Sequence, residues 1–118
     1  MGRGSECNGF PIDTVDVDAF GYTHLVFSFA GISWSGELEP YDGGSEYSSQ
    51  YAKFNYLKTK FPGLKTLIAV GGWTFQQARF CAAASTEVKR EKFAKSVVKF
   101  LDQHGFDGID IDWEYPGA

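Results

Sequence analysis

Long hydrophobic runs are missing from this 118-residue sequence, and no segment approaches the ~20 apolar residues that a membrane-spanning helix needs. Cysteine is scarce, since Cys7 and Cys81 are the only two and define neither a disulfide framework nor a metal site. Positive charge is outweighed, because 11 Lys and Arg stand against 15 Asp and Glu, for a formal net charge of −4. This balance argues against a nucleic acid or an anionic membrane surface as a partner.

Aromatic residues, in contrast, are abundant. They make up 17% of the chain, with eleven Phe, six Tyr and three Trp. Most of them are expected to build a core, and a hydrophobic content of 43% fits one small globular domain. The flat faces of surplus Trp and Tyr side chains also suit the binding of sugar rings.

Hydrophobic patterning divides the chain into alternating strands and helices. Two nearly continuous β-favouring runs, residues 23–30 and 65–70, are typical of strands buried on both faces. The spacing of apolar residues predicts helices over residues 45–60 and 87–104. An acidic strand follows the second helix at once, after a glycine stop at Gly105.

Three other stretches lack regular patterning. We expect residues 1–22 to be irregular with at most a short helix, and residues 31–44 to form a long loop. A polar loop and a short Ala-rich stretch around Cys81 follow the second strand. The order strand, helix, strand, helix, strand predicts a parallel sheet built from βαβ units. In such sheets functional residues lie at the carboxyl ends of the strands.

The acidic strand carries the strongest chemical signal. Asp110, Asp112 and Glu114 sit two apart, so on a strand their carboxylates share one face. Asp107 has the other parity and is interpreted as structural. The βαβ order predicts a central strand buried on both faces, where lined-up carboxylates repel one another. This arrangement indicates a site that keeps one acid protonated for chemistry.

Two other interpretations of the acids fit less well. A calcium loop of the EF-hand type needs Gly at its sixth position and Glu at its twelfth. Counted from Asp110, the sixth position is Tyr115. A solvated amphipathic edge strand would also alternate acids with Ile and Trp, but the predicted central position argues against it.

The pattern Asp-x-x-Asp-x-Asp-x-Glu over residues 107–114 resembles the signature of glycoside hydrolase family 18, the chitinases. Three segments resemble the second, third and fourth barrel strands of that family in order: residues 22–30, 67–73 and 106–117. The resemblance covers residues 20–118. The ending Asp-Trp-Glu-Tyr-Pro-Gly-Ala is similar to the fungal class V chitinases, including their killer-toxin-like group.

The resemblance implies an α/β fold, a fragment of a (β/α)8 TIM barrel covering about strands 2 to 4. It implies that residues 1–118 are part of a catalytic domain whose first strand and strands 5 to 8 are absent from this sequence. The implied reaction is hydrolysis of β-1,4-linked N-acetylglucosamine in chitin or chitooligosaccharides by a substrate-assisted retaining mechanism. Endo action is favoured over exo action. No metal or cofactor is implied.

Roles follow residue by residue from the resemblance. Glu114 is the expected general acid and base, Asp112 orients the substrate acetamido group, and Asp110 shares a proton with Asp112. The remaining expected contacts are with substrate: Gly71, Gly72, Trp73, Thr74 and Tyr115. The chain departs from the family at Ala69, where a serine is common, so a hydroxyl that would support Asp110 is missing.

The resemblance also sets expectations for the whole protein. We expect a secreted, monomeric chitinase whose signal peptide would precede the absent first strand, and we expect these 118 residues alone to be inactive. Two alternatives from other classes stay open: a non-catalytic chitin-binding relative and an inactive truncated remnant. Cleavage within the chitobiose core of N-glycans uses the same motif, although the class V details favour chitin.

Overall fold

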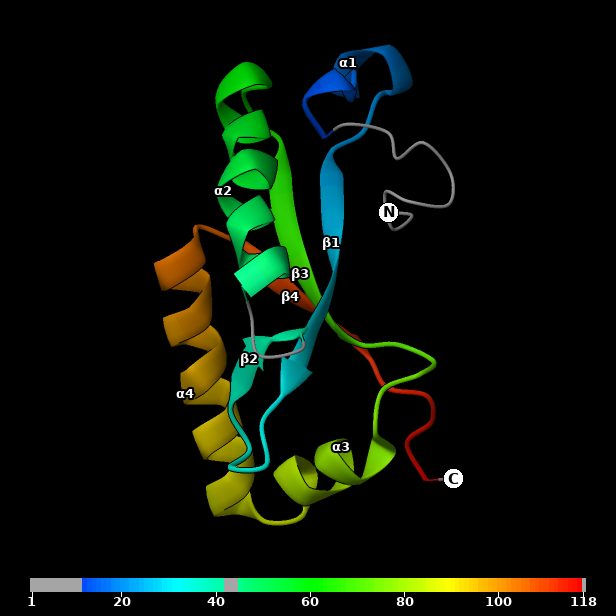
Figure 1. Cartoon of the computed structure of the whole chain (residues 1–118), viewed down its shortest axis with the longest axis vertical. Coiled ribbons are helices and arrows are strands. Elements are labelled where there is room, and N and C mark those ends of the chain that lie inside the picture. The colour runs from blue at the N-terminus through cyan, green and yellow to red at the C-terminus, as the bar shows by residue number, and fades with distance from the viewer. Residues whose placement is uncertain (1–11, 42–44, 118) are drawn as a thin grey trace.

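The computed structural model describes residues 12–41 and 45–117. Strands and helices alternate along the chain (Figure 1). The elements are η1 (Ile12–Thr14), α1 (Val17–Phe20), β1 (His24–Ile32), β2 (Leu38–Pro40), α2 (Ser45–Lys60), β3 (Lys65–Gly71), α3 (Gln77–Ala84), α4 (Glu87–His104) and β4 (Gly108–Asp112). Within the described ranges, no helix has the length and apolar character needed to cross a bilayer.

The four strands form one sheet in the order β2-β1-β3-β4. Strand β1 pairs with β3 in parallel, and β3 pairs with β4 in parallel, which confirms the predicted βαβ arrangement. Strand β2 is antiparallel to β1, so the sheet is mixed rather than purely parallel. The α/β class is confirmed.

The hairpin of β1 and β2 corrects the prediction of one long loop over residues 31–44. A tight turn closes it, with Ser33 N–H donating to the Glu37 carbonyl at 2.8 Å and Gly36 in a positive-φ conformation (+82°). Strand β2 has only three residues, too few to show an alternating pattern. Its pairing is set by contacts far along the chain, such as Leu38 N–H donating to Ser96 Oγ on α4 at 2.9 Å.

Strand β4 also differs from the prediction. It pairs only with β3 among the described strands, so it is an edge strand rather than a central one. Its Ile111 side chain is 54% exposed, because no described element covers that part of the strand. The strand ends at Asp112, so Glu114 lies just beyond it instead of on it.

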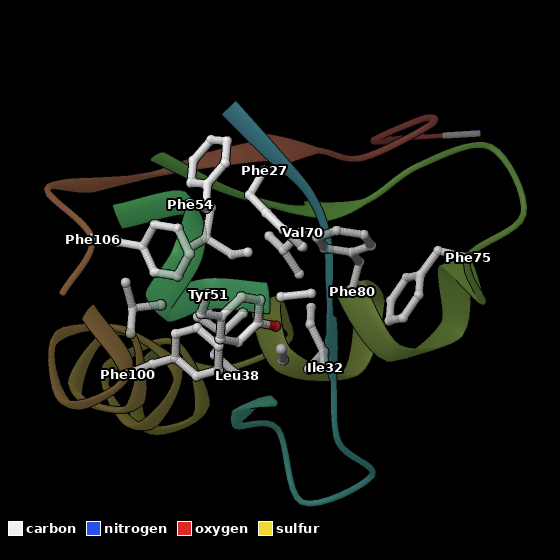
Figure 2. Packing of buried hydrophobic residues seen from close by; sticks show 14 residues of the cluster. Phe27, Ile32, Leu38, Tyr51, Phe54, Val70, Phe75, Phe80, Phe100 and Phe106 are labelled. Atoms are coloured by element: carbon white, nitrogen blue, oxygen red, sulfur yellow. The ribbon is translucent and has the colours of Figure 1, made fainter. Parts of the chain in front are cut away.

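Helices α2 and α4 lie side by side against the sheet, and aromatic side chains fill the space between them and the strands (Figures 1 and 2). Tyr51 of α2 makes edge-on ring contacts with Phe27, Phe100 and Phe106, with ring centroids 5.1–5.8 Å apart. These contacts explain the high aromatic content as mostly core.

The predicted helices α2 and α4 are confirmed. Helix α4 begins where the Thr86 side chain accepts a hydrogen bond from Lys89 N–H, and it ends at Gly105 with φ +79°. Helix α3, in contrast, forms over the Ala-rich stretch around Cys81, for which the sequence predicted no element. Its N-cap residue, Gln76, makes no side-chain capping bond, so the sequence carries no helix-start signal there. Cys81 is a free, exposed thiol, and Cys7 lies outside the described residues.

Asp107 ties the start of β4 to β3 and α2, as its predicted structural role requires. Its Oδ2 accepts from Lys58 Nζ at 3.0 Å and from Thr66 N–H at 2.9 Å, and Lys65 Nζ lies 3.8 Å from Oδ1. Partial burial alone would raise the pKa of Asp107. The Thr66 hydrogen bond and the two lysines outweigh it and hold the pKa below its ordinary value.

We expect Asp107→Asn to lower the free energy of unfolding by about 1–2 kcal/mol at neutral pH. Because the folded-state pKa is depressed, the stabilisation is present above the unfolded pKa and is lost as pH falls through the folded value. Urea unfolding of wild type and variant should therefore converge in acid. Asp102→Asn, an exposed change on α4, is the control. A difference that persists unchanged in acid would contradict the ionic explanation.

Candidate active site

The acidic residues and the glycine-rich loop, far apart in sequence, meet at one edge of the sheet. In the parallel ladder Ala69 lies opposite Asp110, and Gly71 lies opposite Asp112. Gly72 N–H then donates to the Asp112 carbonyl at 3.0 Å, just past the end of β3. The carboxyl ends of β3 and β4 therefore form one continuous site (Figure 1).

The three acids differ in how they are held. Asp110 is exposed on β4, whereas Asp112 and Glu114 are half-buried at the strand end and just after it. Ile109 of β4 and Trp113, just beyond the strand, pack against the core cluster. Ile111 lies between them and is 54% exposed, so burial along β4 does not follow the predicted alternation throughout.

No Lys or Arg side chain forms an ion pair with the three acids in the described part of the chain. Every ion pair found among residues 12–41 and 45–117 involves other acids, and none joins a Lys or Arg to Asp110, Asp112 or Glu114. The β3 residues opposite the two aspartates are Ala69 and Gly71, which bring no charge. The three acids therefore lie at alternate positions with no ion-pair partner among the described residues.

The described part of the chain contains no group of three or more His, Cys, Asp and Glu side chains arranged to hold a metal ion. The alternate spacing of the acids along an extended strand accounts for this, because neighbouring carboxylates are then about 7 Å apart.

Gly71 and Gly72 are glycines for steric reasons. Their φ angles are +111° and +89°, a region that other residues rarely adopt. A Cβ on Gly71 would lie 2.2 Å from the Asp112 carbonyl oxygen and 2.8 Å from the Phe80 ring. A Cβ on Gly72 would lie 2.9 Å from the Phe29 ring. The close approach of β3 to β4 therefore requires Gly71, and the close packing of the Phe29 ring of β1 against the loop requires Gly72.

The predicted substrate contacts on the loops are open to solvent. Trp73 is 76% exposed, Tyr115 is 60% exposed, and Thr74 is also exposed. Trp113 differs, because it stacks on Phe80 of α3 with ring centroids 5.2 Å apart and planes 8° apart. Two ring faces thus stay available near the acids, while the third aromatic ring anchors the strand end to α3.

Sequence reasoning missed a neighbouring group of side chains on the hairpin and α3. Trp34, in the β1–β2 turn, is 73% exposed and has the Arg79 guanidinium 4.6 Å from its ring centroid. A tryptophan in a Ser- and Gly-rich turn was the available signal. The link from Arg79 to the hairpin gave no local signal, because Ile32 and Glu39 lie 47 and 40 residues away from it in sequence.

Comparison with known proteins places this chain in a family. Residues 3–118 match the family model for glycosyl hydrolases family 18. The chain is 46% identical to mouse chitotriosidase-1 over 103 residues, which cover 87% of this chain and 22% of the mouse protein. It therefore spans about a fifth of that relative's length.

Solved structures agree. A group IV chitinase from Ostrinia furnacalis, crystallised with allosamidin, superposes with a TM-score of 0.81 at 36% identity, covering 92% of this chain and 29% of the insect chain. Human YKL-39, a pseudo-chitinase with retained chitooligosaccharide binding properties, superposes with a TM-score of 0.78 at 34% identity, covering 95% and 29%. The chain is thus an α/β unit matching part of chitinase structures. The fungal subgroup stays a prediction.

We expect Gly71→Ala to destabilise the fold by about 3 kcal/mol or more, because it adds a steric clash to an unfavourable φ. Gly36→Ala is the matched control, since Gly36 also has positive φ but a Cβ there would meet nothing within 4 Å. It should cost about 1 kcal/mol. Chemical denaturation of both variants provides the comparison. Equal losses would show that the approach of β3 to β4 is not sterically tight.

Proposed function

The chain belongs to glycosyl hydrolases family 18, and from this premise we propose that it forms part of a chitinase catalytic domain. The proposed reaction is hydrolysis of β-1,4 linkages between N-acetylglucosamine units, with endo action favoured. One observation carries the proposal: the complete set Asp110, Asp112 and Glu114 lies beside the exposed loop that bears Trp73. A binding-only protein has no need of all three acids.

In the proposed mechanism Glu114 acts first as an acid and then as a base. It protonates the glycosidic oxygen of the leaving sugar, while the substrate's own acetamido oxygen attacks the anomeric carbon to give an oxazolinium intermediate. Glu114 then takes a proton from the water that opens this intermediate. Its half-buried position just beyond β4 supports the role, because the residue is held close to the strand yet reachable by substrate.

The two aspartates are proposed to assist Glu114 from β4. Asp112 accepts a hydrogen bond from the acetamido N–H, which orients the nucleophilic oxygen and stabilises the positive charge that develops. Asp110 shares a proton with Asp112, since both project from the same face of one strand. Ala69, opposite Asp110, offers no hydroxyl, so this pair depends on solvent or on other side chains for further hydrogen bonds.

Substrate binding is assigned to the loop after β3 and to the residue after Glu114. Trp73 and Tyr115 present ring faces on which a pyranose ring can stack, and Thr74 adds a hydroxyl. Gly71 and Gly72 let the backbone of this loop run close to the acids. The proposed partner is chitin or a chitooligosaccharide, a substrate that lies outside cells, which supports a secreted protein. A monomeric state is proposed from the family resemblance alone.

A non-catalytic chitooligosaccharide-binding role is the second candidate. The likeness to human YKL-39, a pseudo-chitinase that retains chitooligosaccharide binding, favours it. The two candidates differ in one respect, because only the first requires Glu114 to transfer protons. Measuring both hydrolysis and binding of chitooligosaccharides therefore distinguishes the two candidate functions.

We expect Glu114→Gln to lower kcat on chitooligosaccharides by about 10²–10⁴-fold or more. The variant is made in the longest natural protein that contains this sequence. Binding should persist, because the amide keeps the size of the carboxylate. Glu87→Gln, in the first turn of α4, is the matched control and should leave the rate unchanged. Normal turnover by Glu114→Gln would overturn the proposed mechanism. Absence of turnover in the unmodified protein, with binding intact, would favour the binding role.

These 118 residues alone are expected to release no product from chitooligosaccharides. The described strands form an open four-stranded sheet, so the acids face a site without an opposite wall, and water has free access to it. The check is end-point product analysis by mass spectrometry after long incubation. Detectable hydrolysis that disappears in Glu114→Gln would show that the short chain suffices.

A further inference from the structure

Glu114 is not held in place by polar contacts within the described part of the chain. None of the hydrogen bonds and ion pairs found there involves its side chain. Strand β4 ends before it, at Asp112, whose carbonyl accepts the hydrogen bond from Gly72 N–H. Glu114 is nevertheless half-buried, so the packing of its neighbours decides where its carboxylate lies.

The residue before Glu114 supplies this packing. Trp113 stacks face to face on Phe80 of α3, with the ring centroids 5.2 Å apart and the ring planes 8° apart. Because a planar peptide unit joins Trp113 to Glu114, a fixed Trp113 side chain constrains the backbone from which Glu114 projects. The Phe80 ring is therefore connected to the acid through a single residue.

The Phe80 ring is itself held on its other sides. Phe75 contacts it edge-on, with ring centroids 5.4 Å apart and ring planes at 77° (Figure 2). Gly71 lies so close that a Cβ there would be 2.8 Å from the Phe80 ring. Phe80 is only 4% exposed. In a close-packed interior such a ring cannot tilt without moving its neighbours, so it gives Trp113 a rigid support.

A purely structural role would give Phe80 no more influence on a reaction than any other buried phenylalanine. Phe100 of α4 provides the comparison, because it is 5% exposed and belongs to the same core cluster. Its ring neighbours include Tyr51 and His104, which do not belong to the candidate active site. The two phenylalanines thus differ in what they contact and not in how deeply they are buried.

We propose that Phe80 is a positioning residue for Glu114, which acts through the indole ring of Trp113. The inference rests on the proposed function, because it deepens the role assigned to Glu114. Proton transfer needs the two heavy atoms to be about 2.6–3.2 Å apart. A small displacement of the carboxylate therefore slows the reaction more than it weakens the binding of the sugar.

The test compares Phe80→Leu with Phe100→Leu in the longest natural protein that contains this sequence. Leucine keeps an apolar side chain at position 80 but removes the flat ring that supports Trp113. We expect kcat on chitooligosaccharides to fall about 10–100-fold in Phe80→Leu. KM should change by less than about twofold, since the lost interaction acts in the transition state. Phe100→Leu should lower the stability but keep the kcat of the folded protein.

Crystal structures of the same proteins provide a readout that does not depend on turnover. The Glu114 carboxylate should move by about 0.5 Å or more in Phe80→Leu, enough to disturb a catalytic geometry, and stay in place in Phe100→Leu. If Phe80→Leu does not fold, Phe80→Met replaces it, because the flexible methionine side chain fills an irregular gap better and also lacks the ring. The same results are expected.

The combined results separate this inference from the proposed function. A lower kcat with a displaced Glu114, seen only for the change at Phe80, supports both. An unchanged kcat, an equal loss in Phe100→Leu, or a lower kcat with Glu114 in place overturns the inference and leaves the function standing. Absence of turnover in the unmodified protein overturns the proposed function. In that case the position of Glu114 in the crystal structures decides alone whether Phe80 positions it.

Discussion

The approach of β3 to β4 at Gly71 is the constraint on which the site depends. No side chain fits there, because a Cβ on Gly71 would lie 2.2 Å from the Asp112 carbonyl oxygen. The hydrogen bond from Gly72 N–H to that oxygen then closes the strand ends together. As a result the carboxyl end of β4, which carries the acids, and the loop that bears the exposed Trp73 ring lie at the same edge of the sheet.

The opposite end of β4 is fixed by charge rather than by shape. Asp107 joins Lys58 of α2 to the backbone of Thr66 on β3 and thereby sets where β4 begins. A strand held at both ends keeps its register, and a slip by one residue would turn Asp110 and Asp112 to the core face. Asp107 and Gly71 therefore have the same effect, which is to hold Asp110 and Asp112 on the open face of the sheet.

Much of this arrangement could be predicted because its signals are local. Helix α4 has both a capping threonine and a terminal glycine, and the buried strands β1 and β3 are continuous apolar runs. The acids and the glycine pair could be placed at one sheet edge because parallel strands end together. The central position assigned to β4 was wrong, since strand order depends on which elements pair and not on the strand's own sequence.

The missed elements share a different cause. Strand β2 and helix α3 are too short to show a period, and Arg79 links them through partners roughly 40 residues away in sequence. Such long-range polar contacts leave no trace in a local pattern. The acidic motif is thus readable from the sequence, whereas the link that Arg79 makes between α3 and the β1–β2 hairpin appears only in the fold.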